Sequence, residues 1–221
     1  MKANISKKII DDFKKNKLES ILNIKEKLIK IEDMASTNWS KHRAWKESNL
    51  PSYDEIFFLL SIVQNDFAKA LLTTIYLTAC RSSELVKLKY GDIRKVKNKD
   101  KTLFIFDMIN YRNRYTKFKQ IPIVLDSEGQ FVKFLMPYFN LIDDPERVLF
   151  DISTQMVRKI VWKYLYMSPY TLRIIRINHL VNVFNINALQ LKDYAGFESI
   201  NTARRYKNKK WKSILQGWNK K

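Results

Sequence analysis

The stretch from Asp66 to Thr78 is apolar on most of its helical faces, and this limits what the chain can fold into. It contains no proline or glycine, so its pattern predicts one uninterrupted helix. A helix of this kind is stable only when other elements cover it on most sides. The sequence therefore predicts a packed core with this helix at its centre. Its apolar residues are Phe67, Ala68, Ala70, Leu71, Leu72, Ile75 and Leu77.

Two short runs rich in β-branched and aromatic residues predict strands. They are Thr102–Phe106 and Gln120–Val124. A basic segment from Tyr111 to Lys119 connects the two runs or extends one of them. Elsewhere the pattern is mostly helical, and a short helix is expected over residues 81–88. The expected fold class is therefore mainly α with a small antiparallel β-sheet (α+β).

Several polar residues mark where helices begin and end. Ser52 and Glu55 are three residues apart ahead of an apolar run, which is the spacing of a capping box. Two more N-caps and one C-cap are expected from residue type and position. These boundary residues are the serines Ser153 and Ser168 and the glycine Gly196.

The chain is strongly basic, with a net charge of +19 from 41 Lys and Arg against 22 Asp and Glu. An excess of this size favours a polyanionic partner. A solvated basic surface produced by an AT-rich genome is one alternative. Binding to a membrane surface is another, although the basic residues are not confined to one amphipathic helix. No apolar run approaches the roughly 20 residues of a bilayer-spanning helix, and the single cysteine, Cys80, fits a reducing interior.

Two segments after the core helix carry arginines in a pattern that suits phosphate. Arg81 stands three residues before Glu84, and Tyr170, Arg173 and Arg176 recur at helical spacing on one face. Arginine suits a phosphate because its planar fork donates two parallel hydrogen bonds and keeps its charge. Two structural alternatives stay open: an ion pair at the start of a helix for the first segment, and an ordinary solvated helix face for the second.

A third segment ends in a tyrosine. Arg204 and Arg205 precede Tyr206, and the lysine-rich tail that follows contains no aspartate or glutamate. A charge run of this kind is usually a solvated tail. The interleaved Trp211 and Trp218 favour instead a helix that docks on something. A tyrosine hydroxyl that converges with several arginines suggests attack on a phosphodiester.

In this order the three segments resemble the sequence boxes of the tyrosine recombinase (integrase) family. Thr78 to Leu85 resemble T-G-x-R-x-S-E-L, with alanine and cysteine at the second and third positions. Residues 170–173 resemble H-x-L-R, and residues 195–206 resemble L-G-H-x-S-x-x-T-x-x-Y. The resemblance covers roughly residues 52–206 and suggests a divergent member of archaeal or viral source.

The resemblance implies roles for five residues. Arg81 and Arg173 would clamp the scissile phosphate, and Tyr206 would attack it to form a 3′-phosphotyrosyl link. Tyr170 would replace the family's histidine and could donate a hydrogen bond to a phosphate oxygen. Lys117, on the hairpin ahead of the second strand, would protonate the leaving oxygen.

The assignment of the hairpin acid stays open, because Lys119 lies nearer the strand and Arg114 better matches the family's spacing to the proline. A second departure is Phe197, which stands where the family has a histidine or tryptophan and which could only pack. The basic side chains near these boxes are expected to contact DNA. They are Arg112, Arg114, Lys119, Arg176, Arg204 and Arg205.

The resemblance implies a site-specific DNA recombinase or integrase that needs no metal and no other cofactor. The alternative is a catalytically weak or inactive DNA-binding protein on the same fold. A metal-dependent nuclease would need convergent carboxylates, and Asp92, Asp107 and Asp126 fall in no recognisable pattern. A protein-interaction module would instead bind its partner with little dependence on salt.

Partners and domains follow from the same resemblance. We expect double-stranded DNA, self-association on DNA as a dimer or tetramer, no membrane, and a cytoplasmic location near the nucleoid of a prokaryotic or virus-infected cell. Residues 1–50 are interpreted as a short helical N-terminal segment, a reduced DNA-clamping or oligomerisation arm, with helices over 4–15 and 17–34. Residues 51–221 are interpreted as the catalytic domain with a basic C-terminal tail.

Overall fold

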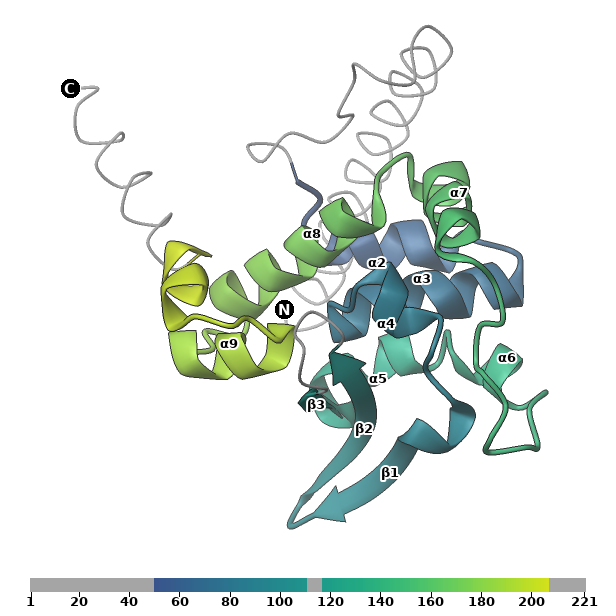
Figure 1. The fold of residues 1–221 in the computed structure, drawn as a ribbon, viewed down its shortest axis with the longest axis horizontal. Coiled ribbons are helices and arrows are strands. Elements are labelled where there is room, and N and C mark those ends of the chain that lie inside the picture. Colours follow the sequence, from purple (N-terminus) through teal and green to yellow (C-terminus); the bar gives the residue numbers. More distant parts are fainter. Residues whose placement is uncertain (1–49, 111–116, 207–221) are drawn as a thin grey trace, which may run out of the picture.

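The computed structural model describes residues 50–110 and 117–206. The expected N-terminal helices, the boundary near residue 50 and the basic tail lie outside these residues. Within them, helices surround a long central helix, and a small sheet lies to one side (Figure 1). No described helix combines the length and the apolar character that crossing a bilayer requires.

The described helices are short except for α3, α7 and α8. The elements are α2 (Tyr53–Ser61), α3 (Asp66–Thr78), α4 (Ser82–Leu85), a 3₁₀ turn η2 (Tyr90–Asp92), α5 (Leu125–Val132), α6 (Met136–Phe139), α7 (Thr154–Leu165), α8 (Pro169–Asn182) and α9 (Ala188–Ala195). Residues 200–206 are also helical. The N-caps expected at Ser52, Ser153 and Ser168 and the C-cap expected at Gly196 are all confirmed.

The core helix α3 has the bounds that its apolar pattern predicts. Asn65 caps its start, and its last turns are buried on every side. The hydroxyls of Thr74 and Thr78 donate to backbone carbonyls one turn earlier, so these two polar groups cost little in the apolar interior. Ala79 then takes a left-handed conformation, with φ 47°, and ends the helix. The chain therefore turns sharply just before Arg81.

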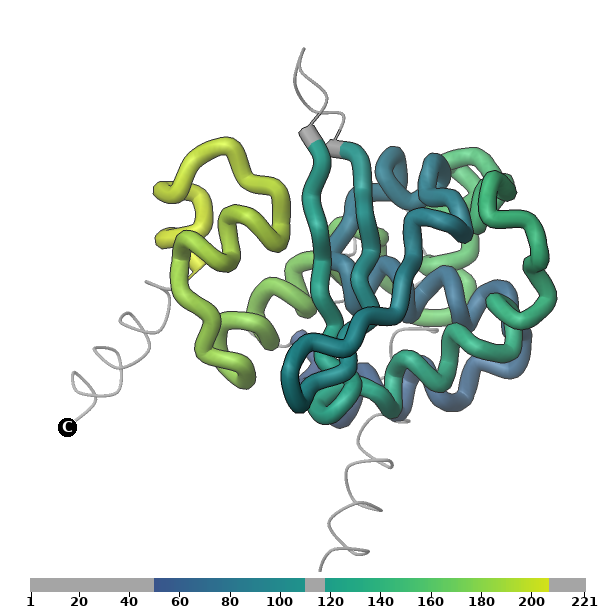
Figure 2. The backbone as a smooth tube through the Cα atoms, turned by 90° about the horizontal axis from the view of Figure 1, so that it is seen from below, coloured from purple at the N-terminus to yellow at the C-terminus, as the bar shows by residue number. Residues whose placement is uncertain are grey.

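The sheet contains three antiparallel strands in the order β1-β2-β3. They are β1 (Ile93–Asn98), β2 (Lys101–Asn110) and β3 (Lys117–Val124). The two expected strands lie inside β2 and β3, which run side by side for most of their length (Figure 2). The edge strand β1 was not expected, because its two apolar residues, Ile93 and Val96, are three positions apart and show no period-two alternation among the charged residues. Charged residues of this kind are common on exposed edges.

Two apolar clusters hold the chain together. The larger surrounds α3 and includes residues from the sheet, from α5 and from α7. The smaller lies under α8 and α9 and joins them to the helical residues 200–206. Its buried members are Ala79, Ile174, Ile177, Leu180, Val181, Leu191, Ala195 and Ala203. This second cluster therefore fixes the third sequence box against the turn that carries the first.

Arg176 belongs to the interior, so the expectation that it contacts DNA is wrong in this structure. Its side chain is completely buried and forms a double ion pair with Glu128, whose second contact spans 2.9 Å. It also donates to the Tyr194 hydroxyl at 2.9 Å and lies over the ring of Phe184. A buried charge needs such partners to offset its lost hydration. Arg176 therefore has no surface to offer a duplex.

His179 links this buried group to the start of the described chain. Its Nε2 donates to the Pro51 carbonyl at 3.0 Å, since a carbonyl can only accept, and its Nδ1 accepts from the Tyr76 hydroxyl at 2.9 Å. The contact in which Nδ1 accepts requires the neutral imidazole, because a protonated Nδ1 cannot accept a hydrogen bond. Burial, with a smaller contribution from the charge of Arg176, lowers the pKa of His179 to about 4.

This depressed pKa predicts a loss of stability in mild acid. The unfolded chain binds a proton near the ordinary pKa of about 6.5, so between pH 6.5 and 4 it holds more protons than the folded chain. The free energy of unfolding should fall by about 3 kcal/mol across that window on this account. Urea unfolding at pH 7 and pH 4 should show a smaller fall in His179→Gln. An equal fall in both proteins would remove His179 as the cause.

Candidate active site

A cavity of about 680 Å³ opens between α4, α7 and the first turn of α8. Its lining combines three arginines with several hydroxyl groups and aromatic rings. No aspartate or glutamate is among the described residues that line it. A site with this composition favours an anion. The lining residues are Cys80, Arg81, Ser82, Ser83, Thr154, Arg158, Trp162, Met167, Ser168, Pro169, Tyr170 and Arg173.

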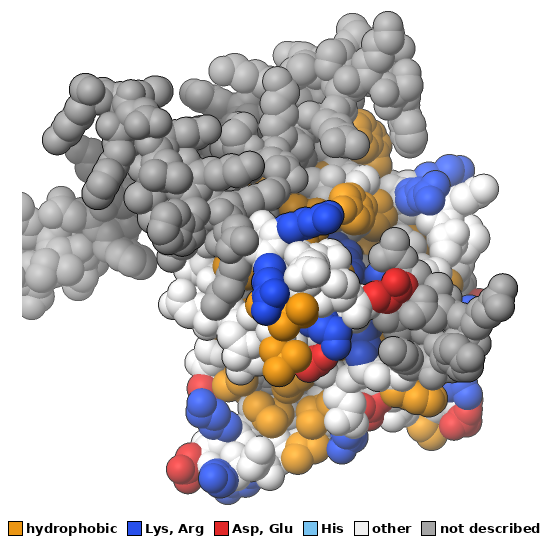
Figure 3. Space-filling model, turned by 60° about the vertical axis from the view of Figure 1, so that its left-hand side comes forward, with side chains coloured by type: hydrophobic (Ala, Val, Ile, Leu, Met, Phe, Trp, Pro, Cys, Tyr) orange, Lys and Arg blue, Asp and Glu red, His pale blue; other side chains and the backbone are white. Residues whose placement is uncertain are grey.

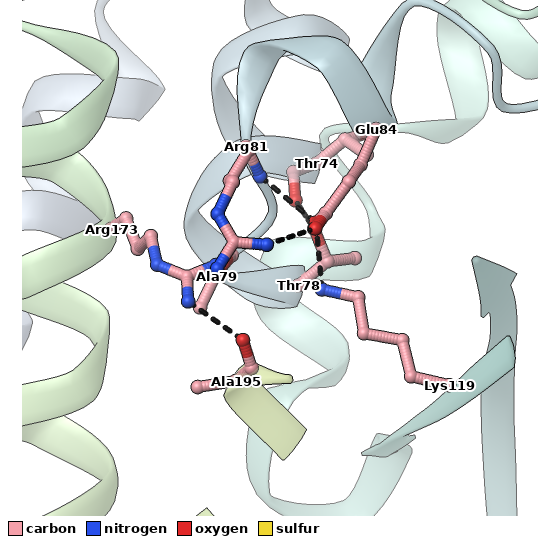
Figure 4. A network of polar contacts seen from close by, with 8 residues as sticks. All are labelled: Thr74, Thr78, Ala79, Arg81, Glu84, Lys119, Arg173 and Ala195. Carbon is pink, nitrogen blue, oxygen red and sulfur yellow. Dashed lines mark hydrogen bonds and ion pairs between the residues drawn. The ribbon is translucent and has the colours of Figure 1, made fainter. Parts of the chain in front are cut away.

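Arg81 is fixed at one wall of this cavity by Glu84. The Glu84 carboxylate accepts from the Arg81 backbone at 3.0 Å and from its guanidinium at 2.8 Å, and it also accepts from Lys119 Nζ at 2.8 Å (Figure 4). The structural ion pair that the sequence left open is therefore present. It does not exclude phosphate binding, because the Arg81 side chain keeps 25% of its surface exposed. The pair holds the guanidinium in one orientation.

Lys119 supports Glu84 from the sheet and is itself buried. Burial acts to raise the pKa of Glu84, but the charge of Lys119 and the hydrogen bonds to it outweigh that effect, so the pKa of Glu84 lies below its usual value. Burial lowers the pKa of Lys119, and Glu84 only partly offsets this. With 5% of its side chain exposed, Lys119 is no surface contact for DNA, which corrects that expectation. It is a positioning residue for Glu84 and, through it, for Arg81.

Arg173 is held even more rigidly. It is 3% exposed and donates to the carbonyl oxygens of Ala79 and Ala195, the second at 2.6 Å (Figure 4). These carbonyls close α3 and α9, where a cation is also favoured by the helix dipoles. Burial lowers the pKa of Arg173, and Arg81 lowers it further. Because a guanidinium carries five donors, both contacts leave donors that can face the cavity.

Tyr206 reaches this cluster through an aromatic ring. Its ring stacks on Phe197 with centroids 5.7 Å apart and an interplanar angle of 6°. The guanidinium of Arg173 lies over the same Phe197 ring, 5.6 Å from its centroid. The structure thus brings the second and third boxes together. Tyr206 is not among the residues that line the cavity, whereas Tyr170 lines it and is 67% exposed.

The remaining expected residues fall into two groups. Arg204 and Arg205 are exposed on the helical segment before Tyr206, with Arg204 donating to Asn201 at 3.4 Å. Lys117 begins β3 opposite Asn110. The side chain of Lys117 and all of Arg112 and Arg114 lie outside the described residues. Lys and Arg side chains gather near the centre of one face of the molecule (Figure 3).

The contribution of α7 was not predicted from the sequence. Thr154, Arg158 and Trp162 of this helix all line the cavity. They are spaced by four residues, which places them on one helical face. Together with the N-cap at Ser153, which was recognised, this spacing was the signal that could have identified Arg158 as a cation of the site.

Cys80 lines the cavity but is a poor candidate for the attacking group. Burial, assisted by Glu84, raises the pKa of its thiol to about 11. The thiolate is the reactive form of cysteine. At neutral pH the thiol is therefore protonated and unreactive.

Comparisons with solved structures identify the fold. The XerH site-specific recombinase bound to a palindromic difH substrate after cleavage matches with a TM-score of 0.59 at 15% identity, over 83% of this chain and 56% of that one. XerA recombinase matches with a TM-score of 0.55 at 17% identity, over 84% and 69%. A lambda integrase dimer bound to a COC′ core site matches with a TM-score of 0.52 at 12% identity, over 78% and 63%.

The chain therefore has the fold of a tyrosine recombinase catalytic domain, mainly α with a small antiparallel sheet, as the sequence predicted. It spans a little over half the length of XerH, 53% of the chain in the complex before cleavage. No protein-family model and no curated protein sequence matches this chain.

Proposed function

We propose that this protein is a site-specific DNA strand transferase of the tyrosine recombinase type. One observation carries the proposal: Arg81 and Arg173, from segments far apart in the sequence, line one cavity whose described lining contains no carboxylate. The ring of Phe197 joins Tyr206 to Arg173. Residues of the first and second sequence boxes thereby line a space that suits the phosphate of a DNA strand, and the third box packs against Arg173.

The chemistry is a transesterification at phosphorus. The Tyr206 oxygen forms a bond to phosphorus and its proton passes to water, while the bond from phosphorus to the 5′-oxygen breaks. The electron pair leaves with the 5′-oxygen, which takes up a proton and becomes a hydroxyl. The protein then holds the DNA through a 3′-phosphotyrosyl ester. Attack by a second 5′-hydroxyl reverses these bond changes, so the scheme needs no ATP and no metal.

The arginines stabilise the negative charge that develops in this step. As the phosphorus becomes five-coordinate, charge grows on the nonbridging oxygens, and fixed donors stabilise it most. Arg81 is fixed by Glu84, and Arg173 by two backbone carbonyls, so neither must reorganise during the reaction. Tyr170, exposed beside them, is proposed to donate to one of the same oxygens.

A cation of the β2–β3 hairpin is proposed to protonate the leaving 5′-oxygen. Lys117 is our first choice and Arg114 the alternative. Lys119 suits this role least, because its ammonium is buried and bound to the Glu84 carboxylate. A donor held in that way would have to break its ion pair before it could transfer a proton.

The partner proposed is double-stranded DNA, with self-association into a dimer or tetramer on it. Support comes from the net charge of +19, from the cationic cavity, and from fold neighbours whose structures contain DNA. Residues 1–50 are proposed as a DNA-clamping or oligomerisation arm, and the protein as one that works at the nucleoid.

A DNA-binding protein without strand-transfer activity is the second candidate. It is favoured by two observations: Tyr170 and Phe197 replace the family's hydrogen-bonding side chains, and Tyr206 does not line the cavity. Such a protein would bind DNA with a steep dependence on salt but would form no covalent product.

A capture experiment separates the two candidates. The full chain is incubated with a pool of nicked duplexes of randomised sequence, in which the short downstream fragment that carries the new 5′-hydroxyl can diffuse away after cleavage. The mixture is denatured in detergent, and DNA that remains attached to protein is sequenced. Strand transfer predicts attached DNA that converges on one site. Tight binding without any detergent-resistant attachment would support the second candidate instead.

Arg158 provides a test of the proposed DNA contact. We expect Arg158→Gln to weaken binding to all sequences alike and to make the slope of log K against log [salt] shallower by about 0.9, since one phosphate contact is lost. Arg94→Gln is the matched control, because Arg94 of β1 is also exposed but pairs with Asp107 of β2 and does not line the cavity. Fluorescence anisotropy at several salt concentrations measures both slopes. Equal slopes in the two variants would place the phosphate path elsewhere.

A further inference from the structure

The backbone at the end of α9 fixes the position of Phe197. Gly196 ends α9 in the left-handed region, with φ 64°. The Gly196 amide donates to the Asp193 carbonyl at 3.3 Å, and the Phe197 amide donates to the Lys192 carbonyl at 2.9 Å. This pair of bonds is a Schellman motif, which sets the direction of the residue that follows the glycine. The ring of Phe197 is therefore aimed by the end of the helix.

Two groups of the proposed chemistry meet on that ring. The guanidinium of Arg173 lies over it at 5.6 Å from the centroid, and the ring of Tyr206 stacks almost parallel to it at 5.7 Å. Arg173 also donates to the carbonyl of Ala195, one residue before the glycine. The end of α9 thus holds Arg173 by a hydrogen bond and by the ring of Phe197, and the same ring also contacts Tyr206.

We propose that Phe197 is a positioning residue that sets the plane and place of the Tyr206 ring relative to Arg173; this rests on the function proposed above. A histidine or tryptophan at this position, as the sequence resemblance implies, would offer a hydrogen bond. Phenylalanine offers none. It instead aligns the nucleophile and the phosphate clamp through contacts with both. Alignment of this kind matters because a nucleophile must approach phosphorus along a narrow direction.

The variants are chosen to separate the ring from the volume it fills. Phe197→Leu removes the aromatic face and keeps an apolar side chain. Phe197→Tyr restores the face. Phe184→Leu is the matched control, because Phe184 packs against the same small apolar cluster and contacts a buried arginine, Arg176, but makes no ring contact with Tyr206.

The first readout needs no DNA. In protein labelled with 3-fluorotyrosine, the ¹⁹F resonance of Tyr206 is the one that disappears in Tyr206→Phe. The stack predicts that this resonance moves in Phe197→Leu, because the ring current of Phe197 is lost, and that it stays in place in Phe184→Leu. An unmoved Tyr206 resonance in Phe197→Leu overturns the proposal whether or not the protein cleaves DNA.

The second readout is the single-turnover rate of adduct formation at saturating DNA. Phe197→Leu should lower this rate about 10-fold or more, the worth of a lost stack and a lost cation–π contact, and leave Kd unchanged. Phe197→Tyr should recover most of the rate. The defect of Phe197→Leu should persist on DNA with a 5′-bridging sulfur, whose thiolate leaves without a proton donor, because attack by Tyr206 is what fails.

The outcomes distinguish this proposal from the function beneath it. If wild type forms an adduct and Phe197→Leu forms it within twofold of the same rate, the positioning role is wrong while strand transfer stands. Rescue of Phe197→Leu by the bridging sulfur would also contradict the proposal, since it would assign Phe197 to the leaving group. If wild type forms no adduct, the proposed strand transfer is wrong, and the positioning role of Phe197 is wrong with it.

Discussion

Tyr206→Phe should abolish the covalent protein–DNA adduct and leave DNA affinity unchanged. The substitution removes only the hydroxyl, while the phenyl ring can keep its stack on Phe197. The fold and the cation-lined cavity should therefore be preserved. With no oxygen at this position, no ester to phosphorus can form. The comparison is made by detergent gel of the captured adduct and by anisotropy for Kd.

The matched control for this prediction is Tyr170→Phe. Tyr170 lines the cavity and is exposed, so its hydroxyl is the rival nucleophile. As a hydrogen-bond donor to a phosphate oxygen, its loss should slow adduct formation without preventing it. An adduct that survives in Tyr206→Phe and vanishes in Tyr170→Phe would reverse the two assignments.

Arg173→Lys should lower the rate of adduct formation by about 10²- to 10³-fold, the usual cost of losing one fixed donor to developing charge. Lysine keeps the positive charge, but its single ammonium cannot reproduce the planar fork that contacts Ala79, Ala195 and the cavity together. The rate is measured in single-turnover reactions at saturating DNA. A rate within a fewfold of wild type would mean that Arg173 serves only to cap α3 and α9.

Arg173→Lys also removes buried contacts and will lower stability. A second variant therefore separates the loss of rate from the loss of stability. Arg81→Lys changes a residue that is more exposed and has its main described contact with Glu84. We expect a similar loss of rate with a smaller loss of stability, measured as Tm by circular dichroism. If the loss of rate in each variant instead followed its loss of Tm, the rates would report lost stability, and this result would contradict the proposed phosphate clamp.

Local signals predicted much of the fold. The bounds of α3 follow from its apolar run, and the capping box at Ser52 and the left-handed Gly196 mark helix ends as expected. The short helix after Arg81 ends at Leu85 rather than at residue 88. The edge strand β1 was missed because lysines and an arginine make up half of its residues, a composition that pattern alone assigns to a loop.

Residue type and spacing predicted some residues of the candidate site. The sequence could not show the contacts between residues that are far apart along the chain. Arg81 and Arg173 line one cavity, as their boxes suggested. The burial of Arg176 was not predictable, because its partner Glu128 lies 48 residues away and only the packed fold brings them together. Lys119 is sequestered by Glu84 for the same reason.

Phe197 shows that a changed residue in a sequence pattern does not reveal what the new side chain contacts in the fold. From sequence, a phenylalanine in place of a hydrogen-bonding residue signals a lost group. The structure instead gives the ring two partners, Arg173 and Tyr206. Neither contact could be inferred from the sequence, since both depend on the turn at Gly196 and on how the last described helix packs over α8 and α9.

The most direct measurement is the identity of the residue that carries the DNA. Adduct captured from wild-type protein is digested with nuclease and protease, and the modified peptide is sequenced by mass spectrometry. The proposed function predicts one nucleotide linked through its 3′-phosphate to the hydroxyl of Tyr206. A nucleotide on Tyr170 or any other residue, a 5′-phosphate linkage, or no modified peptide at all would contradict it.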